Sequence, residues 1–396
     1  MVEIALDITG IAHGGVSVAR HEGKVVFVAD TLPGERVLAR IIEDKRSYAR
    51  AVAIDVIAPS PDRVPHVWPE AAIERDPAER AGGAEFGHIR LEHQRELKRE
   101  VFVDALRRFA HVERDVVVEA VPGDDEVGGL RWRTRVSLHV DEGGTPGPYA
   151  ARSHRVVPVT DLPLADAAIS SVLQERFAGE ERIEVIATPS GLRLVIGDQQ
   201  PSVVTERAAG REFQVDDTGF WQVHRAAPDI LHAATRDAID PEAFDPNAEN
   251  LDLYGGVGLL ATAIADLGGP STRVTTIESD ARASQHAGTN LADLPEAEAV
   301  HARVDRWIAD VARRGERFDG ATIVLDPPRT GAGRDVAAAL TQLGASQLVY
   351  VACDPVALAR DTGAIIAGGY ELTRLRAFDL FPHTHHLESI ATFVRR

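Results

Sequence analysis

Short apolar runs separated by glycine or charged turns fill the first 58 residues and predict a small β-barrel. Several short strands at regular spacing are typical of a barrel or a sandwich. Four prolines between positions 59 and 69 then predict a linker. The predicted strands are 4–8, 16 onward after a glycine pair, 25–28, 37–41 and 51–57.

The next periodic segment, 90–109, has apolar residues every four positions and predicts an amphipathic helix with a basic side. Strand-like runs return from about 130 to 210, beginning at residues 131–140. Alternation along that run would place Arg131, Arg133 and Arg135 on one sheet face, opposite Trp132. Arginines on an open face either hold RNA phosphates or form an ordinary solvated surface, and the pattern alone does not decide.

From about residue 215 the pattern becomes strand, glycine loop, helix and strand. The run 251–253 leads into a glycine loop at 254–258 and a helix-like stretch at 259–265. This order predicts a doubly wound α/β domain whose ligand lies at the carboxyl ends of the strands. Further predicted strands are 274–277, 321–325, 347–352 and 390–394.

These patterns divide the chain into five parts, with a Rossmann-like α/β domain at the C-terminal end. The β-rich central part and the N-terminal barrel both precede that domain. The predicted parts are a barrel at 1–58, a linker at 59–89, a helix at 90–118 packing on the C-terminal domain, a β-rich domain at 119–212 and the α/β domain at 213–396.

Composition narrows the class. The 396 residues carry a net charge of −18, which argues against indiscriminate coating of polyanions but leaves room for a local basic groove. One cysteine excludes an internal disulfide or a cysteine-ligated cluster within the chain and suits a reducing compartment. The first 20 residues lack a basic start followed by an apolar run, so we expect a cytoplasmic protein without a membrane segment.

The glycine loop indicates a nucleoside-like cofactor without identifying it. Gly256, Gly258 and Ala261 fit G-x-G-x-x-A, and Glu278 follows at the spacing of a ribose-binding acid, so a nicotinamide cofactor fits equally well. The element Asp326-Pro-Pro-Arg329 ends a later strand and aims a carboxylate and a guanidinium at the same edge. Hydride transfer has no need for that element.

The single cysteine, Cys353, follows the strand 347–352. Asp354 is a helix-capping residue type and Pro355 suits the first helical position, so the thiol would lie at a helix N-terminus, where partial positive charge favours thiolate. A small buried hydrophobe is the alternative. Glu388 precedes the last strand, and a thiolate and a carboxylate in one cleft suggest addition to an activated double bond followed by proton removal.

These motifs resemble the RNA uracil-5-methyltransferase family, which makes 5-methyluridine with S-adenosylmethionine. The resemblance covers nearly the whole chain, and residues 8–37, with His13-Gly-Gly15, look like the RNA-binding TRAM barrel. The other matching segments are 220–224 (F-x-Q-V-N in the family), 252–258 (D-L-Y-C-G-x-G), 326–329 (D-P-P-R), 353–355 (C-N-P), 358–361 and 381–388.

The resemblance implies a role for each site residue. Cys353 would attack uracil C6, and Glu388 would remove the C5 proton. Asp305 would face the adenine or only solvent, and His383, His385 and His386 would be solvated or hydrogen-bonded, with no metal. S-adenosylmethionine would be held by Gln222, Tyr254, Gly256, Gly258, Glu278 and Asp326, and substrate RNA would be contacted by Arg131, Arg133, Arg135 and Arg329.

Departures from the family pattern also carry information. Some relatives bind an iron–sulfur cluster, but the corresponding positions here, Trp68, Ala81, Ala84 and Asp161, lack sulfur, so we expect no cluster. Gly255 replaces a cysteine, which should be harmless. Asp354 replaces asparagine and would oppose thiolate formation unless it caps the helix, and His224 replaces the asparagine of the cofactor motif.

The resemblance therefore predicts an RNA uridine C5-methyltransferase that acts as a monomer on a flipped-out base. The TRAM-like barrel favours 23S ribosomal RNA over transfer RNA as the substrate. The alternatives are a transfer RNA uridine-54 methyltransferase and a catalytically silent RNA-binding protein. An amino-group methylase would carry an aromatic residue after the two prolines, where this chain has Arg329.

Overall fold

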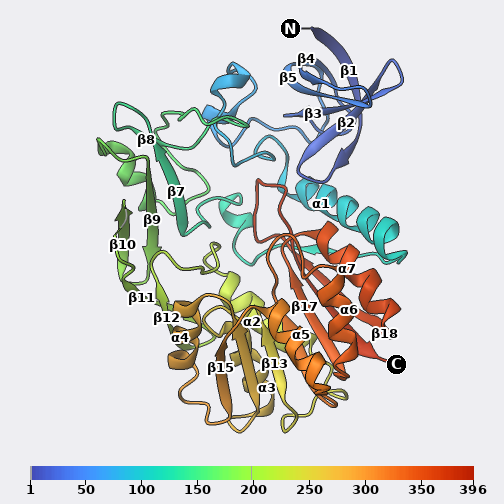
Figure 1. The fold of residues 1–396 in the computed structure, drawn as a ribbon. Coiled ribbons are helices and arrows are strands. Elements are labelled where there is room, and N and C mark those ends of the chain that lie inside the picture. The colour runs from blue at the N-terminus through green and yellow to red at the C-terminus, as the bar shows by residue number, and fades with distance from the viewer. Residues whose placement is uncertain (1, 198) are drawn as a thin grey trace.

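A closed five-stranded barrel forms the N-terminal end of the molecule (Figure 1). The computed structural model describes residues 2–197 and 199–396. Alternate residues of the strands, such as Leu6, Val26 and Val37, point inward and are fully buried. The predicted barrel is confirmed. Its strands are β1 (Glu3–Ala12), β2 (Val16–His21), β3 (Lys24–Ala29), β4 (Arg36–Asp44) and β5 (Tyr48–Ala58), in the order β1-β2-β3-β5-β4.

Helix α1 (Leu91–Ala105) follows the linker, which contains the short turns η1 (Pro69–Ala71) and η2 (Pro77–Glu79). The helix continues as a π-helical turn, η3 (Leu106–Ala110), which shifts the apolar stripe and leaves Phe109 half-exposed. Lys98 does not belong to an exposed basic side of this helix. Lys98 is buried, and its Nζ donates to Asp379 Oδ1 at 2.5 Å and to the carbonyl of Phe381 at 3.0 Å.

The central part is a four-stranded sheet beside a two-stranded one, with two short 3₁₀ turns, η4 (Asp125–Val127) and η5 (Ile169–Gln174). The larger sheet has the order β10-β9-β7-β8 and buries Leu138, Ile183 and Val185 in a core of its own. The strands are β7 (Arg135–Val140), β8 (Pro146–Gly147), β9 (Arg182–Thr188), β10 (Gly191–Ile196), β11 (Val203–Ala208) and β12 (Arg211–Asp216).

The three arginines at 131–135 do not share a strand face, contrary to prediction. Strand β7 begins only at Arg135, and Arg131 has a left-handed φ of 62°. Arg131 pairs with Asp161 at 2.6 Å, and Arg135 pairs with the buried Glu206 at 3.0 Å. Two of the three guanidinium groups therefore form ion pairs within the protein.

Apolar packing fills the positions that correspond to cluster ligands in some relatives. Trp68, Ala81 and Ala84 are buried in the central core, and Asp161 is paired with Arg131. Within residues 2–197 and 199–396, no three His, Cys, Asp or Glu side chains are grouped to hold a metal. The residues present therefore do not fit an iron–sulfur cluster, and hydrophobic packing holds this segment instead.

An eight-stranded mixed sheet covered by helices forms the C-terminal part and confirms the doubly wound prediction (Figure 1). Its order is β15-β14-β13-β16-β17-β19-β18-β6, and the strands from β15 to β17 run parallel. Central residues such as Leu251, Ile323 and Leu348 are fully buried. The strands are β6 (Val118–Glu119), β13 (Asn250–Leu253), β14 (Val274–Glu278), β15 (Ala297–His301), β16 (Thr322–Leu325), β17 (Gln347–Ala352), β18 (Tyr370–Phe378) and β19 (Glu388–Arg395).

Among the residues that the structure describes, six helices flank this sheet, and α7 also packs against α1. Phe102 and Leu106 of the α1 region enter the same core as Leu358 and Ile365 of α7. In the described ranges, no helix has both the length and the apolar character needed to cross a membrane. The helices are α2 (Ala227–Ala238), α3 (Leu259–Gly268), α4 (Ala281–Asn290), α5 (Val304–Arg314), α6 (Arg334–Gln342) and α7 (Pro355–Ala367).

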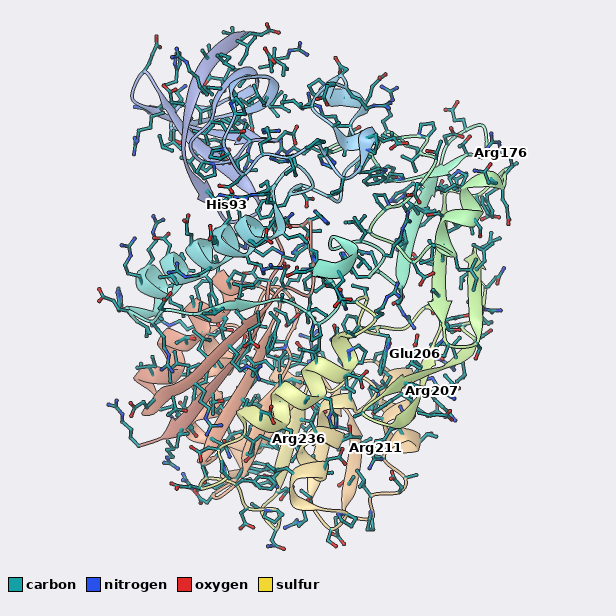
Figure 2. All side chains as sticks on the ribbon, turned by 180° about the vertical axis from the view of Figure 1, so that it is seen from behind. His93, Arg176, Glu206, Arg207, Arg211 and Arg236 are labelled. Carbon is teal, nitrogen blue, oxygen red and sulfur yellow. The ribbon has the colours of Figure 1, made fainter. Side chains whose placement is uncertain are left out.

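Surface arginines are often paired with nearby acids, which limits exposed positive charge. Arg207 pairs with Glu212 at 2.9 Å, and Arg211 pairs with Asp293 at 2.8 Å, on the face shown in Figure 2. Exposed pairs of this kind contribute little to stability. They do lower the local positive charge, in keeping with the net charge of −18.

Candidate active site

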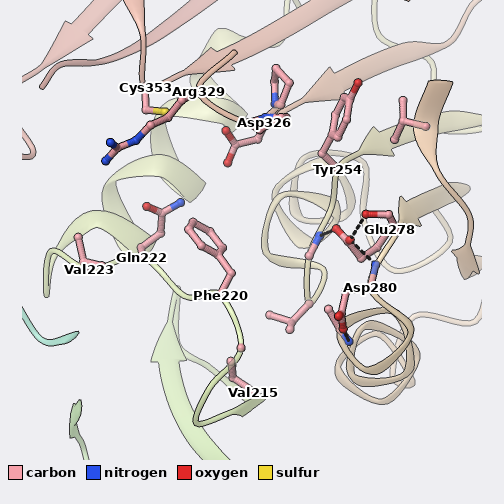
Figure 3. A pocket seen from close by; sticks show the side chains of 18 of the residues that line it. Val215, Phe220, Gln222, Val223, Tyr254, Glu278, Asp280, Asp326, Arg329 and Cys353 are labelled. Carbon is pink, nitrogen blue, oxygen red and sulfur yellow. Dashed lines mark hydrogen bonds between the residues drawn. The ribbon is translucent and has the colours of Figure 1, made fainter. Parts of the chain in front are cut away.

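One cavity of about 1090 Å³ lies at the carboxyl ends of the parallel strands and gathers most of the predicted site residues (Figure 3). Three predicted residues, Gly258, Arg131 and Arg135, do not line it. This position agrees with the rule that ligands of open α/β sheets bind outside the strand ends. The predicted residues that line the cavity are Arg133, Gln222, Tyr254, Gly256, Glu278, Asp305, Asp326, Arg329, Cys353 and Glu388.

The glycine loop after β13 is shaped by backbone conformations that side chains rarely adopt. Tyr254 has a φ of 62° and Gly256 a φ of 55°, and a Cβ at Gly256 would meet no atom within 4 Å. Gly256 therefore leaves open space at the cavity. Gly258 instead is the N-cap of α3, with a left-handed φ of 92°, and a Cβ there would lie 3.3 Å from the side chain of Leu291, so its role is to hold the loop.

Buried acids fix the same loop from behind. Asp252 Oδ2 accepts hydrogen bonds from the amide of Ala261 at 3.0 Å and from Thr276 Oγ1 at 3.1 Å. A Cβ at Gly255 would lie only 1.9 Å from Thr276 Oγ1. In this chain the Thr276 side chain therefore occupies the space that a cysteine side chain at position 255 would need. Gly255 is thus required here, and the prediction that it is merely harmless was incomplete.

Glu278 ends β14 and lines the cavity beside the glycine loop (Figure 3). Its Oε2 accepts the amide of Gly256 at 3.0 Å, and its Oε1 accepts the amide of Asp280 at 2.7 Å. Asp280 in turn caps α4 by accepting the amides of Arg282 and Ala283. The acid that follows the glycine loop is therefore held in place by backbone groups before any ligand binds.

Asp252 and Asp326 are buried acids whose ionisation is suppressed. Burial raises the pKa of Asp252 to about 7, and burial together with the nearby Asp252 raises the pKa of Asp326 to about 7. Because the two neighbouring carboxylates repel each other when both are ionised, a cation bound near Asp326 would favour their charged forms.

These raised pKa values predict that the ligand-free protein loses stability as pH rises from 6 to 8. A carboxyl whose folded pKa lies above its unfolded pKa of about 4 stabilises the fold below the unfolded pKa, and that contribution is lost as pH rises through about 7. Thermal melting at pH 6, 7 and 8 measures the effect, and Asp326→Asn should flatten it.

Asp305→Asn is the matched control for that measurement. Asp305 lines the same cavity but is exposed, and a hydrogen bond from Arg303 lowers its pKa. Its substitution should leave the slope between pH 6 and 8 unchanged. A melting temperature that rises over this range in the wild type, or the same slope in Asp326→Asn, contradicts the assignment.

Cys353 follows β17, and the predicted cap is confirmed. Asp354 Oδ1 accepts the amides of Val356 at 3.0 Å and Ala357 at 2.8 Å, and Pro355 occupies the first turn of α7. The prediction that the helix favours thiolate was wrong for the ligand-free protein. Burial, followed by the nearby Glu388 and Asp326, raises the pKa of Cys353 to about 12. The helix amides are satisfied by Asp354.

Glu388 is the first residue of β19 and is only 3% exposed. Burial and the neighbouring Asp326 raise its pKa well above the usual range, and the guanidinium of Arg329 partly opposes this shift. Burial and the nearby acids therefore favour the neutral forms of both Cys353 and Glu388 in the ligand-free site. Such matched, raised pKa values in one cavity are typical of groups that exchange protons during a reaction.

The segment before Glu388 is anchored by α1. Gln94 Oε1 accepts the amide of His383 at 2.7 Å, and the His383 ring contacts the carbonyl of Gly128 at 2.8 Å. His383 is thus hydrogen-bonded, as one of the two sequence interpretations expects. His386 lines the cavity, and burial lowers its pKa to about 3, so its ring is neutral.

Arg133 and Arg329 bring two neighbouring cations to the wall of the cavity. Arg133 Nε donates to the carbonyl of Arg135 at 3.0 Å, and burial followed by the nearby Arg329 lowers the pKa of Arg133. Arg329 lies beside Cys353 in Figure 3, and no hydrogen bond joins it to another residue drawn there. Their charge is available to an anion or to carbonyl oxygens.

Sequence reasoning missed part of the cavity wall. Phe220 is 73% exposed beside Gln222, although an apolar ring normally avoids water. Its place in the F-x-Q motif was the available signal. Asp216, Arg282 and His286 form a second group whose ion pairs lower the pKa of Asp216 to about 2. His224 instead faces Asp124 at 3.0 Å and does not line the cavity.

The end of the cavity formed by Gly256, Glu278 and Asp326, here called the cofactor end, fits an adenosyl cofactor. Gly256 leaves open space, Glu278 supplies an acid for ribose hydroxyls, and Asp326 supplies a carboxyl without a hydrogen bond to any residue drawn in Figure 3. Asp252 Oδ1 is also buried without a partner among the described residues. Acidic groups with raised pKa values suit a positively charged sulfonium better than a neutral ring.

The fold and this cavity define a class of enzyme that uses an adenosyl cofactor. In this chain the α/β domain that holds the cavity is preceded by a small N-terminal barrel. Residues 3–54 match the TRAM domain, and residues 301–396 match the tRNA (Uracil-5-)-methyltransferase family. An uncharacterized RNA methyltransferase of Streptomyces avermitilis is 39% identical over 98% of this chain and 97% of its own length. The chain belongs to the S-adenosylmethionine-dependent RNA uracil-5-methyltransferase family.

Two further relatives extend the comparison. The 23S rRNA (uracil(1939)-C(5))-methyltransferase RlmD of Vibrio parahaemolyticus is 28% identical over 98% of this chain and 95% of its own length. The crystal structure of Pyrococcus abyssi tRNA (uracil-54, C5)-methyltransferase has a TM-score of 0.71 at 18% identity, covering 98% of this chain and 100% of that one. That likeness confirms the fold.

Proposed function

We propose that this protein methylates C5 of a uridine in 23S ribosomal RNA, with Cys353 as nucleophile and Glu388 as base. The observation that carries the proposal is the meeting of a thiol, a buried carboxyl and the acidic cofactor end in one cavity. The TRAM match and the ribosomal RNA relative support the choice of RNA. The solved transfer RNA enzyme supports only the fold, because its identity is 18%.

The proposed reaction uses the thiol as a reversible covalent catalyst. Cys353 loses its proton to solvent and its sulfur bonds to uracil C6, while the electron pair of the C5–C6 double bond moves toward C5 and O4. Arg329 and Arg133 would stabilise the negative charge that develops on the pyrimidine oxygens. Burial and the nearby acids raise the pKa of Cys353, and the charge of Arg329 opposes them, which is consistent with a thiol that ionises only as its sulfur bonds to C6.

S-adenosylmethionine, when bound, supplies the electrophilic methyl group that C5 accepts. Gln222, Tyr254, Gly256, Glu278 and Asp326 would hold it. Glu388, once it has lost its own proton to solvent, accepts the proton from C5 as a carboxylate; the C5–C6 double bond re-forms, and the C6–S bond breaks to release the Cys353 thiolate. A buried carboxylate is a stronger base than an exposed one, which suits this step.

Trapping with 5-fluorouridine RNA tests this function. Fluorine at C5 cannot leave as a proton, so the intact chain with S-adenosylmethionine should form a covalent RNA adduct that survives denaturing electrophoresis. Cys353→Ala should form none, and its turnover on ordinary RNA should fall by a factor on the order of 10⁴ or more. Because the chain has one cysteine, no other thiol can substitute.

The same assay separates the alternatives. A catalytically silent RNA-binding protein would bind the RNA without an adduct. Fragments of 23S ribosomal RNA and transfer RNA transcripts, each carrying 5-fluorouridine, should differ in adduct yield, with the ribosomal fragments preferred. A higher yield with transfer RNA supports the uridine-54 alternative, and equal adduct from Cys353→Ala contradicts the covalent mechanism.

A further inference from the structure

The turn between β1 and β2 of the barrel reaches the helix that follows the nucleophile. His13 Nε2 lies 2.8 Å from Asp354 Oδ2, although 341 positions separate the two residues. Asp354 uses its other oxygen, Oδ1, to cap α7. Both oxygens of the carboxylate next to Cys353 are therefore engaged, one by the helix amides and one by the barrel.

A second contact from the same turn is independent of the first. Gly15 lies against His385, and a Cβ on Gly15 would stand 2.7 Å from the Cβ of His385. His385 belongs to the segment that leads into Glu388 and contacts the ring of His386, which lines the cavity. The turn thus touches both chain segments that carry the proposed nucleophile and base.

Apolar packing holds this turn against the rest of the protein. Leu32 of the barrel packs with Phe86, Ile89 and Leu97 in a small buried cluster, and Ile11, just before the turn, lies against it. Leu97 belongs to α1, the helix that also anchors the segment before Glu388. The contacts of His13 and Gly15 are therefore made by a supported turn.

We propose that His13 is a positioning residue for the methyl-transfer reaction, holding the Asp354 carboxylate and offsetting its charge so that Cys353 beside it can become a thiolate. The inference rests on the proposed function of Cys353. An asparagine, as in the family motif, could cap α7 without introducing charge. The aspartate of this chain adds a negative charge beside the nucleophile, and the barrel supplies the compensating group.

The charges around these groups agree with this role. The hydrogen bond to Asp354 raises the pKa of His13, against the effects of burial and of Arg360 from α7. Burial opposes the ionisation of Asp354, but the His13 and helix contacts hold its pKa below the usual value. Around Cys353, the groups Glu388, Asp326 and Asp354 oppose the thiolate, and Arg329 favours it.

Alkylation of the single cysteine by iodoacetamide measures the effect of His13 on the ionisation of Cys353 without RNA or cofactor. The rate at pH 7.5 follows the thiolate fraction of Cys353. His13→Gln keeps a hydrogen-bond donor but removes the charge, and should slow alkylation by about threefold to tenfold, which corresponds to a pKa rise of roughly half a unit to one unit. In an Asp354→Asn background the same substitution should have less than about a twofold effect.

This double-mutant design separates positioning from a general structural role. A loss of folding would slow or accelerate alkylation in both backgrounds and would lower the melting temperature. An unchanged rate in His13→Gln, or the same slowing with and without Asp354, overturns the proposal. The 5-fluorouridine adduct is scored separately, so a chain that shows the alkylation link but forms no adduct refutes the proposed function and not the charge linkage.

Gly15→Ala and Gly14→Ala form a matched pair for the docking of the turn. Both glycines have left-handed φ angles, 72° and 87°, so an alanine strains the backbone at either position. Only the Cβ at Gly15 would meet another residue within 4 Å. Gly15→Ala should slow alkylation as His13→Gln does, and Gly14→Ala should not. Equal behaviour of the two variants contradicts a role for docking.

Discussion

Glu388→Gln is expected to accumulate an RNA–protein adduct that already carries the new methyl group. The amide can no longer accept the C5 proton, so the C6–S bond to Cys353 cannot break by elimination, and turnover should fall by about 10² to 10⁴-fold. Ordinary uridine RNA and S-adenosylmethionine labelled in the methyl group are incubated with the variant. The label should appear in the adduct band on a denaturing gel.

The structure makes this substitution a mild one for the fold. Because burial and the nearby Asp326 favour the neutral form of Glu388 in the ligand-free protein, glutamine copies that form in size and charge. The melting temperature at pH 7 should therefore hold or rise. The melting temperature thereby distinguishes a variant that forms no adduct because it has unfolded from a folded variant that has lost only the base.

Two further variants complete the experiment. Glu371→Gln makes the same chemical change on an exposed side chain that pairs with Arg396 at 3.1 Å, and should behave as the wild type. Cys353→Ala combined with Glu388→Gln should form no adduct. Wild-type turnover in Glu388→Gln would exclude Glu388 as the base, and unlabelled adduct would place the block before methyl transfer.

Local sequence signals predicted much of the site because they act over a few residues. The strand 347–352, the cap at Asp354 and the proline at 355 follow from burial and capping preferences, and the structure has all three. The glycine loop and the carboxyl at 326 follow in the same way. Motifs at strand ends are predictable because parallel strands bring their carboxyl ends to one edge.

The effects of residues that are distant in the sequence could not be predicted from the local pattern. The protonation of Cys353 depends on Glu388 and Asp326, which lie on other elements. The ion pairs of Arg131 and Arg135 depend on acids 30 and 71 positions away. The edge strand β15 is only partly buried and has no clean alternation, so it gave no apolar run to detect.

Lys98→Met is expected to destabilise the protein by about 3 to 5 kcal/mol, because removing one partner of a buried ion pair leaves the other charge unpaired. Lys98 and Asp379 are each 1% exposed, and the Nζ–Oδ1 distance is 2.5 Å. Burial lowers the pKa of Lys98 even though Asp379 acts to raise it, so the lysine is costly without its partner. Urea unfolding monitored by tryptophan fluorescence measures the change.

The double variant Lys98→Met with Asp379→Leu tests whether the loss comes from an unpaired charge or from packing. Replacing both partners by apolar residues is often close to neutral, so most of the lost stability should return. Arg99→Met is the matched control on the same helix. Arg99 is 41% exposed and pairs with Asp115 at 3.0 Å, so its change should stay within about 1 kcal/mol.

The same pair also connects stability to the proposed chemistry. Lys98 donates to the carbonyl of Phe381 at 3.0 Å, in the segment that leads to Glu388. Lys98→Met should therefore slow adduct formation with 5-fluorouridine RNA even at temperatures where the variant remains folded. Equal unfolding midpoints for Lys98→Met and Arg99→Met would contradict the energetic argument. Wild-type adduct rates in a folded but destabilised Lys98→Met would show that the contacts of Lys98 with Asp379 and Phe381 serve the fold alone.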